Sequence, residues 1–379
     1  MFKQALLYVM IGAVIGGLSG CDNGKGSAAA SDACRATNSH NCVMDDVAYG
    51  AGVFVAVGQG GPTSRLGSPG PWVEVSTDGI NWKPMDAGYT SSVSVLSSIV
   101  YGTNGFVATD GQRVIFSVDG QNWTSDKLSA QPGEIATVGY DGSRYILYTS
   151  DTTPASPWMV SDNGVDWKNY GTIVDTTSTA GGTPTSIVNV NSTYYAIWQG
   201  NDLTAPNYLT ATSSDGLVWT PRNPALDSTT AMAQLLYANK NFIAFGSDSS
   251  NSVSVNTNVT WGLVAQGTDF NKLTLSKPVT VSGQNYAFSK GAYNGQIYVG
   301  IGISGAFQSS DAINWTQADL SGAMSANSQC QSSTSTGTVP CIATVGIAAA
   351  PGGSFVIVGG AGGQGAESTD GVNWVSSHL

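Results

Sequence analysis

The chain has 379 residues, of which 41% are hydrophobic and only 10% are charged. Its formal net charge is −11, and no cluster of Lys and Arg stands out. An acidic surface repels phosphate backbones, which argues against nucleic-acid binding. With 48 glycines and abundant Ser, Thr and Asn, the composition predicts many short strands joined by polar turns.

Residues 1–20 have the pattern of an export signal. Lys3 supplies a positive start, and residues 5–17 form an apolar stretch that is too short to span a bilayer comfortably. The stretch Leu18-Ser19-Gly20-Cys21 resembles the lipobox of bacterial lipoproteins. This resemblance implies cleavage before Cys21, lipidation of its thiol and a place in the cell envelope, on the inner or the outer membrane. The alternative is an ordinary signal peptide with an incidental cysteine.

The segment that follows, residues 21–41, is small and polar and predicts a flexible tether. The remaining cysteines are Cys34, Cys42, Cys330 and Cys341. An even number of cysteines in an exported chain predicts disulfides. Pairing of each cysteine with its sequence neighbour is favoured, and the alternative joins the N-terminal segment to the last repeat. A metal site is not expected, because the chain has only two histidines.

A turn motif of the form S-x-D-G-x-x-W recurs along residues 42–379, beginning with Ser76 to Trp82. The tryptophans that end its copies are Trp82, Trp123, Trp167, Trp219, Trp261, Trp315 and Trp374, and the copy at Trp261 is degenerate. The acid or amide position holds Asp78, Asp119, Asn163, Asp215, Asp311 and Asp370. A carboxylate there can accept backbone N–H groups of its own turn, so we interpret these residues as structural.

A second pattern, two aromatic residues five positions apart such as Tyr49 and Phe54, precedes most copies and predicts a β-hairpin. One hairpin and one turn motif together make about four strands per repeat. We therefore predict an all-β fold in residues 42–379, a seven-bladed β-propeller with four antiparallel strands per blade. A β-sandwich or a β-helix is the alternative.

The turn motif resembles the Asp-box, or BNR, repeat, whose pattern S-x-D-x-G-x-x-W is one residue longer. The resemblance covers about residues 42–377. Asp-boxes occur in sialidases, xyloglucan-degrading enzymes, sortilin-type receptors and the photosystem II assembly factor. The resemblance therefore implies a propeller and leaves the function open.

Ligands of propellers usually contact the face formed by the loops between second and third strands and between blades. The residues expected near this face are Arg65, Trp72, Arg113, Asp151, Trp158, Trp198 and Asp202. Tryptophans beside Asp and Asn suit sugar rings, by stacking and hydrogen bonding. The alternative interpretation is that these tryptophans pack between sheets.

Catalytic residues cannot be assigned from the sequence. The arginines lie outside any sialidase-like motif, no Ser-His-Asp set is credible, and no cofactor motif is found. A glycoside hydrolase that uses two loop carboxylates remains an alternative, and the candidate residues are Asp110, Asp151, Asp202, Asp227 and Asp248. We predict a lipid-anchored, non-catalytic envelope module that binds a protein or glycan partner. The alternatives are a glycoside hydrolase with a sialidase-like fold and a structural assembly factor.

Overall fold

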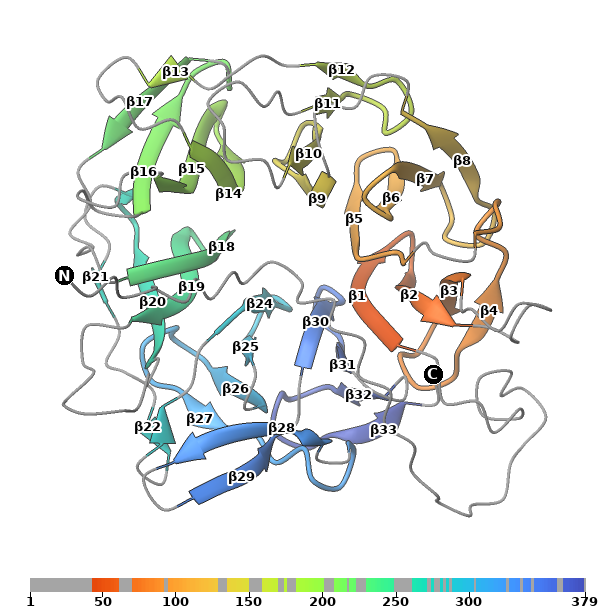
Figure 1. Ribbon diagram of the computed structural model, residues 1–379. Coiled ribbons are helices and arrows are strands. Elements are labelled where there is room, and N and C mark those ends of the chain that lie inside the picture. Colours follow the sequence, from red (N-terminus) through yellow and green to blue (C-terminus); the bar gives the residue numbers. More distant parts are fainter. Residues whose placement is uncertain are drawn as a thin grey trace, which may run out of the picture.

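The computed structural model consists of strands that surround a central axis (Figure 1). It describes residues 43–60, 70–91, 95–128, 135–149, 159–169, 174–175, 182–200, 208–216, 218–222, 230–248, 261–270, 274–275, 280–281, 284–285, 288–302, 305–324, 327–334, 337–341, 344–359 and 364–377. Within these ranges no helix is long and apolar enough to cross a membrane.

The sheets follow one another along the chain and are numbered here in that order. Sheet 1 contains β1 (Val43–Gly50), β2 (Val53–Gly60), β3 (Gly70–Ser76) and β4 (Lys83–Met85). Sheet 2 contains β5 (Ser98–Gly102), β6 (Gly105–Thr109), β7 (Arg113–Ser117) and β8 (Thr124–Lys127). Sheet 3 contains β9 (Ile135–Tyr140), β10 (Tyr145–Thr149), β11 (Met159–Ser161) and β12 (Lys168–Asn169).

Sheet 4 contains β13 (Val174–Asp175), β14 (Gly182–Val190), β15 (Thr193–Gly200), β16 (Tyr208–Ser213) and β17 (Val218–Arg222). Sheet 5 contains β18 (Thr230–Ala238), β19 (Asn241–Asp248), β20 (Trp261–Gly267) and β21 (Thr274–Leu275). Sheet 6 contains β24 (Lys290–Tyr293), β25 (Tyr298–Gly302), β26 (Gly305–Ser309) and β27 (Thr316–Gln317). Sheet 7 contains β30 (Thr344–Ala349), β31 (Phe355–Gly359), β32 (Gln364–Ser368) and β33 (Val375–Ser377).

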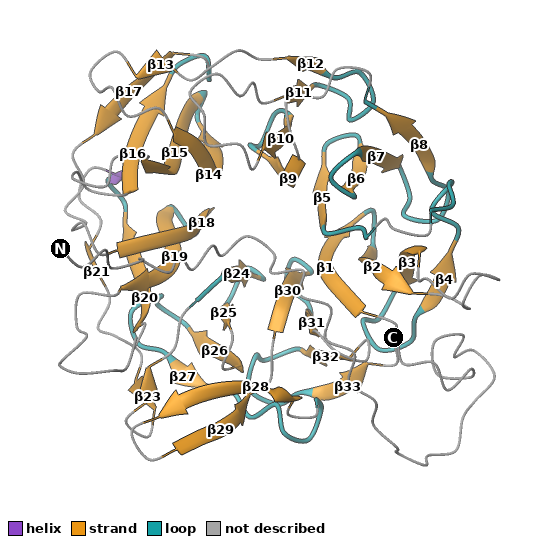
Figure 2. Ribbon diagram, in the orientation of Figure 1, coloured by secondary structure: helices purple, strands orange, loops and turns teal. Residues whose placement is uncertain are grey.

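Two small hairpins lie between these sheets in the chain. They pair β22 (Thr280–Val281) with β23 (Gln284–Asn285), and β28 (Asn327–Thr334) with β29 (Gly337–Cys341). Figure 2 shows both hairpins on the outer side of the ring.

The propeller architecture is confirmed, but the prediction of seven blades with four antiparallel strands is not. Six sheets are four-stranded antiparallel meanders, and the sheet of the fourth repeat has five strands. Its extra strand, β13, pairs in parallel with the outer strand β17. After leaving sheet 3, the chain thus first adds β13 to the outer edge of sheet 4 and then begins β14, the innermost strand of that sheet.

The assignment of Trp261 to the end of a turn motif is wrong. Trp261 opens β20, the third strand of sheet 5, where it pairs with Asp248. The turn of this sheet follows Gly267, which pairs with Phe242 just as Ser76 pairs with Phe54 in sheet 1. By this register, Asp269 takes the place of the motif aspartate. The sequence pattern misled because both Gly and Trp of the motif are absent from this turn.

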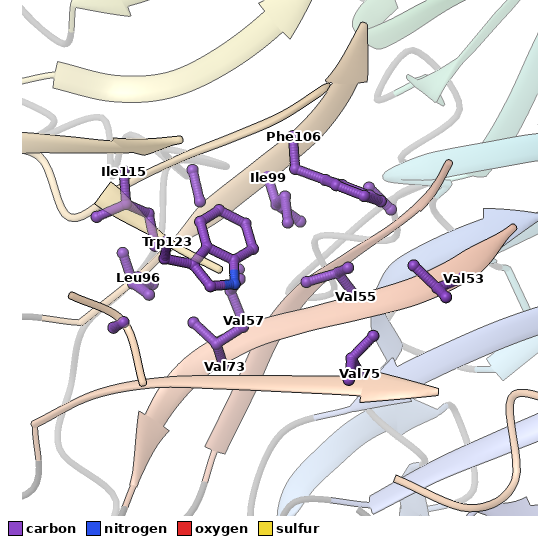
Figure 3. Packing of buried hydrophobic residues seen from close by; sticks show 13 residues of the cluster. Val53, Val55, Val57, Val73, Val75, Leu96, Ile99, Phe106, Ile115 and Trp123 are labelled. Atoms are coloured by element: carbon purple, nitrogen blue, oxygen red, sulfur yellow. The ribbon is translucent and has the colours of Figure 1, made fainter. Parts of the chain in front are cut away.

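Buried side chains fill every interface between neighbouring sheets. The cluster between sheets 1 and 2 combines valines of β2 and β3 with Ile99, Phe106, Ile115 and Trp123 (Figure 3). Six further clusters occupy the other interfaces in turn. Each buried aliphatic or aromatic side chain contributes about 1.5–3 kcal/mol, so the interfaces between sheets supply most of the stabilisation.

The ring closes where sheet 7 meets sheet 1. Met44, Val47 and Phe54 pack there against Val356 and Val358. The Ser377 hydroxyl also donates a hydrogen bond to the carbonyl oxygen of Gly79. Strands of the two sheets do not exchange, because sheet 1 is built from the first strands of the chain and sheet 7 from the last. Closure thus depends on side-chain contacts.

Candidate functional site

The antiparallel order gives the ring two different faces. Tyr49, at the end of β1, pairs with Phe54 at the start of β2, and Phe54 pairs with Ser76 at the end of β3. The hairpin turns and the motif turns therefore lie on one face, called here the turn face. The loops between the second and third strands of each sheet, and the starts of the innermost strands, lie on the opposite face, called here the loop face.

On the turn face, the motif aspartates are held by their own turns. In sheet 1, the Ser76 hydroxyl donates to Asp78 Oδ1 at 2.9 Å, and the backbone N–H groups of Ile80 and Asn81 donate to the same oxygen at 2.9 and 2.8 Å. The side-chain amide of Asn81 donates to Oδ2 at 2.8 Å. Although burial opposes the effect, the hydrogen bonds led by the Asn81 backbone N–H hold the pKa of Asp78 well below its usual range.

The same hydrogen bonds recur around the ring. The motif serine donates to the motif acid or amide at Asp119, Asn163, Asp215, Asp311 and Asp370. At Asp119, the backbone N–H of Asn122 and further hydrogen bonds lower the pKa to about 2. At Asp311 and Asp370, burial is outweighed by hydrogen bonds from the turn, which also lower the pKa to about 2. We call these turns the turn staples; in each of them the Oδ1 of the acid or amide accepts hydrogen bonds from its own turn.

The turn staple of sheet 3 exchanges its acid and amide. Asn163 Oδ1 accepts the backbone N–H groups of Val165 and Asp166, as the aspartates do elsewhere. Its Nδ2 donates to Asp166 Oδ2 at 2.8 Å, so the carboxylate is supplied three positions later. In sheet 3 the acid and the amide are thus exchanged, whereas in sheet 4 Val218 stands at the amide position and only its backbone N–H donates to Asp215 Oδ1, at 3.0 Å.

On the loop face, two of the predicted binding residues have described side chains. Trp72 is half-buried among the residues between sheets 7 and 1, and its Nε1 donates to Glu74 Oε1 at 2.9 Å. This contact favours the packing role for Trp72. The guanidinium of Arg113 lies 5.2 Å from the centre of the Tyr89 ring, within range of a cation–π interaction.

Tyr89 and Arg113 belong to one small network. The Tyr89 hydroxyl donates to Asp110 Oδ2 at 2.7 Å, and the backbone N–H groups of Gln112 and Arg113 donate to Asp110 Oδ1 at 2.8 and 2.6 Å. The network joins the segment between sheets 1 and 2 to the β6–β7 loop. Asp110 is therefore a structural anchor that positions Tyr89 beneath the guanidinium of Arg113.

The remaining predicted site residues are not brought together by the described part of the structure. Arg65, Asp151, Trp158 and Asp202 lie outside the described residues, as do Cys21, Cys34 and Cys42. Trp198 lies in β15, where its backbone pairs with Pro184 and Leu209, but its side chain is outside the described set. Cys330 and Cys341 lie on the two strands of the hairpin β28–β29, and their side chains are likewise not described.

A second polar system encircles the axis of the ring. Each innermost strand carries a residue at the same register, three pairs before the pair of Tyr49 with Phe54 in sheet 1 and before the equivalent pair in each other sheet. These residues are Asp46, Ser98, Thr137, Ser186, Gln234, Lys290 and Gly346. We call them the polar belt; they lie toward the loop face.

Several belt side chains bond to the innermost strand of the next sheet. Asp46 Oδ2 accepts the backbone N–H of Ile99, and Ser98 Oγ accepts that of Val138. Further along, Ser186 Oγ donates to the carbonyl oxygen of Leu235, and Gln234 Oε1 accepts the backbone N–H of Gly291 at 2.6 Å. In all four cases the backbone group belongs to the residue that directly follows the belt residue of the next sheet. These contacts therefore repeat with the symmetry of the ring.

The charged residues of the belt were not among the site residues predicted from the sequence. Lys290 Nζ lies 2.6 Å from Asp46 Oδ1. Asp45 lies beside this pair in a β-bulge of β1, and burial, followed by repulsion from Asp46, raises the pKa of its carboxyl to about 7, against the attraction of Lys290. The adjacent acids Asp45 and Asp46 at the start of an otherwise apolar inner strand were the available signal in the sequence.

Among the described residues, no group of three or more His, Cys, Asp and Glu side chains lies close enough together to hold a metal ion. The belt acids are instead accompanied by a lysine, which competes with a cation for the carboxylate of Asp46.

The chain is similar in fold to solved propellers of very different sequence. Over 89% of its length it superimposes with a TM-score of 0.53 and 11% identity on PorZ, described as an essential bacterial surface component of the type-IX secretion system of Porphyromonas gingivalis, of which it covers only 38%. A streptogramin B lyase gives a TM-score of 0.50 at 8% identity, covering 74% of this chain and 82% of that one. Hydrazine synthase of Kuenenia stuttgartiensis gives 0.52 at 11% identity, covering 87% and 96%.

No sequence profile of a protein family matches the chain. No curated protein matches it in sequence either. The structural similarities at these low identities show the propeller fold and leave the activity open.

Proposed function

We propose that the chain is a binding module of the cell envelope, and that the loop face of the propeller contacts a protein or glycan partner without catalysis. The observation that carries the proposal is the placement of Arg113. Its guanidinium lies over Tyr89, and within the described residues it has no carboxylate partner. The motif carboxylates of the turn face, by contrast, are used by the turn staples.

The chemistry of the partner follows from this arrangement. A guanidinium presented on an aromatic ring favours carboxylate, phosphate or several hydroxyl groups. Sugar hydroxyls and acidic peptide side chains both meet this requirement. The net charge of −11 favours a partner whose acid groups are local, since a strongly anionic surface would be repelled.

The proposal includes the anchor and the architecture. In it, residues 1–20 are a cleaved signal, Cys21 carries the lipid and residues 21–41 form the tether. The five-stranded sheet 4 acts as one blade of a seven-fold ring, and the turn staples are Asp-box repeats. The bond Cys330–Cys341 is favoured over pairing with the N-terminal segment because both residues belong to the hairpin β28–β29.

The direct test is binding by purified full-length chain to a glycan array and to acidic peptides. We expect Arg113→Ala to weaken binding of any ligand found by about tenfold or more, since a charge-assisted contact contributes about 1.5–3 kcal/mol. Lys168→Ala is the matched control, because its side chain is 71% exposed on the outer strand β12. Equal binding by both variants would contradict a role of the loop face.

A glycoside hydrolase is the second candidate, and Asp45 is the observation that favours it. A carboxyl whose pKa is raised to about 7 beside a second carboxylate has the character of a general acid. Release of reducing sugar from any glycan, abolished by Asp45→Asn, would replace the binding-only proposal with this one. Binding without turnover would dismiss it.

A further inference from the structure

The described innermost strands carry only three charged side chains, and all three meet at one place. They are Asp45 and Asp46 on β1 and Lys290 on β24. The other innermost strands, β5, β9, β14, β18 and β30, contain none. A charge at an inner position costs free energy unless it is paired, so this convergence requires an explanation.

The pair joins sheets that are not neighbours. Lys290 belongs to sheet 6 and Asp46 to sheet 1, and sheet 7 lies between them in the ring (Figure 1). Lys290 Nζ lies 2.6 Å from Asp46 Oδ1, while the other carboxylate oxygen of Asp46 accepts the backbone N–H of Ile99 in sheet 2 at 3.2 Å. One carboxylate therefore ties together sheets 6, 1 and 2.

Sheet 7 accommodates this bridge by having a glycine at its belt position. A Cβ on Gly346 would lie 2.8 Å from Asp46 Cα and 3.0 Å from the backbone nitrogen of Val47. Strand β30 thus lies directly against β1 at this height. Gly346 has no side chain to bond to the next sheet, and the Asp46–Lys290 pair spans this position.

We propose that Asp46 and Lys290 form a latch that closes the ring across sheet 7, and that Asp45 beside them makes this latch responsive to pH. The other contacts described at the seam are the apolar cluster between sheets 7 and 1 and the hydrogen bond from Ser377 to Gly79. The ion pair adds a directional contact between the first sheet of the chain and the sheet before the last.

The pH response follows from the surroundings of Asp45. Its carboxyl has a pKa of about 7 because of burial and then of Asp46, opposed by Lys290. The strands packed against β1 are β2, β5, β6, β30 and β31, and they present no charged residue. Their titratable group is Tyr101 of β5, whose ring lies against Gly50 at the far end of β1; Tyr49 lies on β1 itself, near the same end.

Since this pKa is raised above its ordinary value of 3.8, the folded chain holds a proton that the unfolded chain has lost between pH 4 and 7. The contribution of Asp45 is therefore most favourable below about pH 4 and is lost as the pH rises to about 7. The turn staples act in a different window: their lowered pKa values remove stability only as the pH falls from about 4 toward 2.

The test is amide hydrogen exchange and thermal unfolding of the full chain from pH 5 to pH 8. We expect Lys290→Met to accelerate exchange in β1 and β30 by about tenfold or more, relative to β10 and β15 on the opposite side of the ring. Lys168→Met removes the exposed pair with Asp162, 3.7 Å apart, and serves as the matched control with exchange unchanged. Equal acceleration in all four strands, or none, would overturn the latch.

The variant Asp45→Asn tests whether Asp45 causes the pH dependence of stability, and it can be measured even if Lys290→Met does not fold. The wild-type unfolding temperature is expected to fall between pH 5 and 8, and that of Asp45→Asn to stay level over this range. Parallel pH profiles for the two proteins would contradict the role of Asp45. Neither readout involves a ligand, so the latch can fail while the proposed binding function stands, or the reverse.

Discussion

The turn staples and the polar belt are both repeated polar systems, yet they are built on opposite plans. A turn staple bonds residues two or three positions apart, with nearly the same side chains in each repeat. The belt bonds residues of different sheets, and its side chains range from Ser98 to Gln234 to Lys290. In the belt, symmetry of the backbone is thus retained although symmetry of the sequence is lost.

The two plans predict different responses to mutation. Damage to a staple stays in one turn, because its partners are local. Damage to the belt is expected to affect two or three sheets, because its partners belong to different sheets and are separated by 40 or more positions.

Gly346→Ala is expected to lower the free energy of unfolding by about 2 kcal/mol or more, because the new Cβ would press on the backbone of β1 at Asp46 and Val47. Denaturant unfolding measures this loss. Gly322→Ala is the control, since its Cβ would meet nothing within 4 Å. A loss confined to less than about 0.5 kcal/mol at Gly346 would mean that β30 and β1 are less closely packed than the account requires.

Exchanging the acid and the amide in the turn of sheet 3 tests whether a staple depends only on residues of its own turn. Asn163→Asp places two carboxylates together at Asp166 and should cost about 1 kcal/mol. Adding Asp166→Asn recreates the arrangement of the other staples and should restore the stability. If the double variant is as unstable as the single one, partners outside the turn must matter, and the staple is not local.

Ala312→Gly should give the smallest effect, a gain of about 0.5–1 kcal/mol. Ala312 takes the glycine position of the staple in sheet 6 with a φ of 59°, a left-handed conformation that glycine adopts at lower cost. Thermal unfolding measures the gain. A loss of stability would indicate that the methyl group, buried beside Phe245 and Phe307, contributes more by packing than it costs in strain.

The same contrast explains what could be predicted from the sequence. The staples predicted the propeller because a local motif repeats residue by residue, and they located six of the seven motif turns. They failed at sheet 5, where Asp269 stands in the turn without the Gly and Trp of the motif, and Trp261 supplied a false match. The parallel strand β13 has only two residues and no pattern of its own.

The belt could not be predicted, since its members share a register and not a residue type. Asp46 and Lys290 are 244 positions apart, and only the closed ring brings them together. Of the predicted loop-face residues, both Trp72 and Arg113 are half-buried, but Trp72 packs between sheets 7 and 1 whereas the guanidinium of Arg113 lies over the Tyr89 ring. A tryptophan near the end of a strand has the same sequence pattern in both roles.

A double-mutant cycle on Asp46 and Lys290 measures the coupling free energy of the latch. Asp46→Asn, Lys290→Met and the double variant are compared by denaturant unfolding, alongside the same cycle on the exposed pair Asp162 and Lys168. We predict a coupling free energy of about 1–2 kcal/mol for the inner pair and less than about 0.5 kcal/mol for the outer pair. Equal coupling in the two cycles would contradict a latch formed by Asp46 and Lys290.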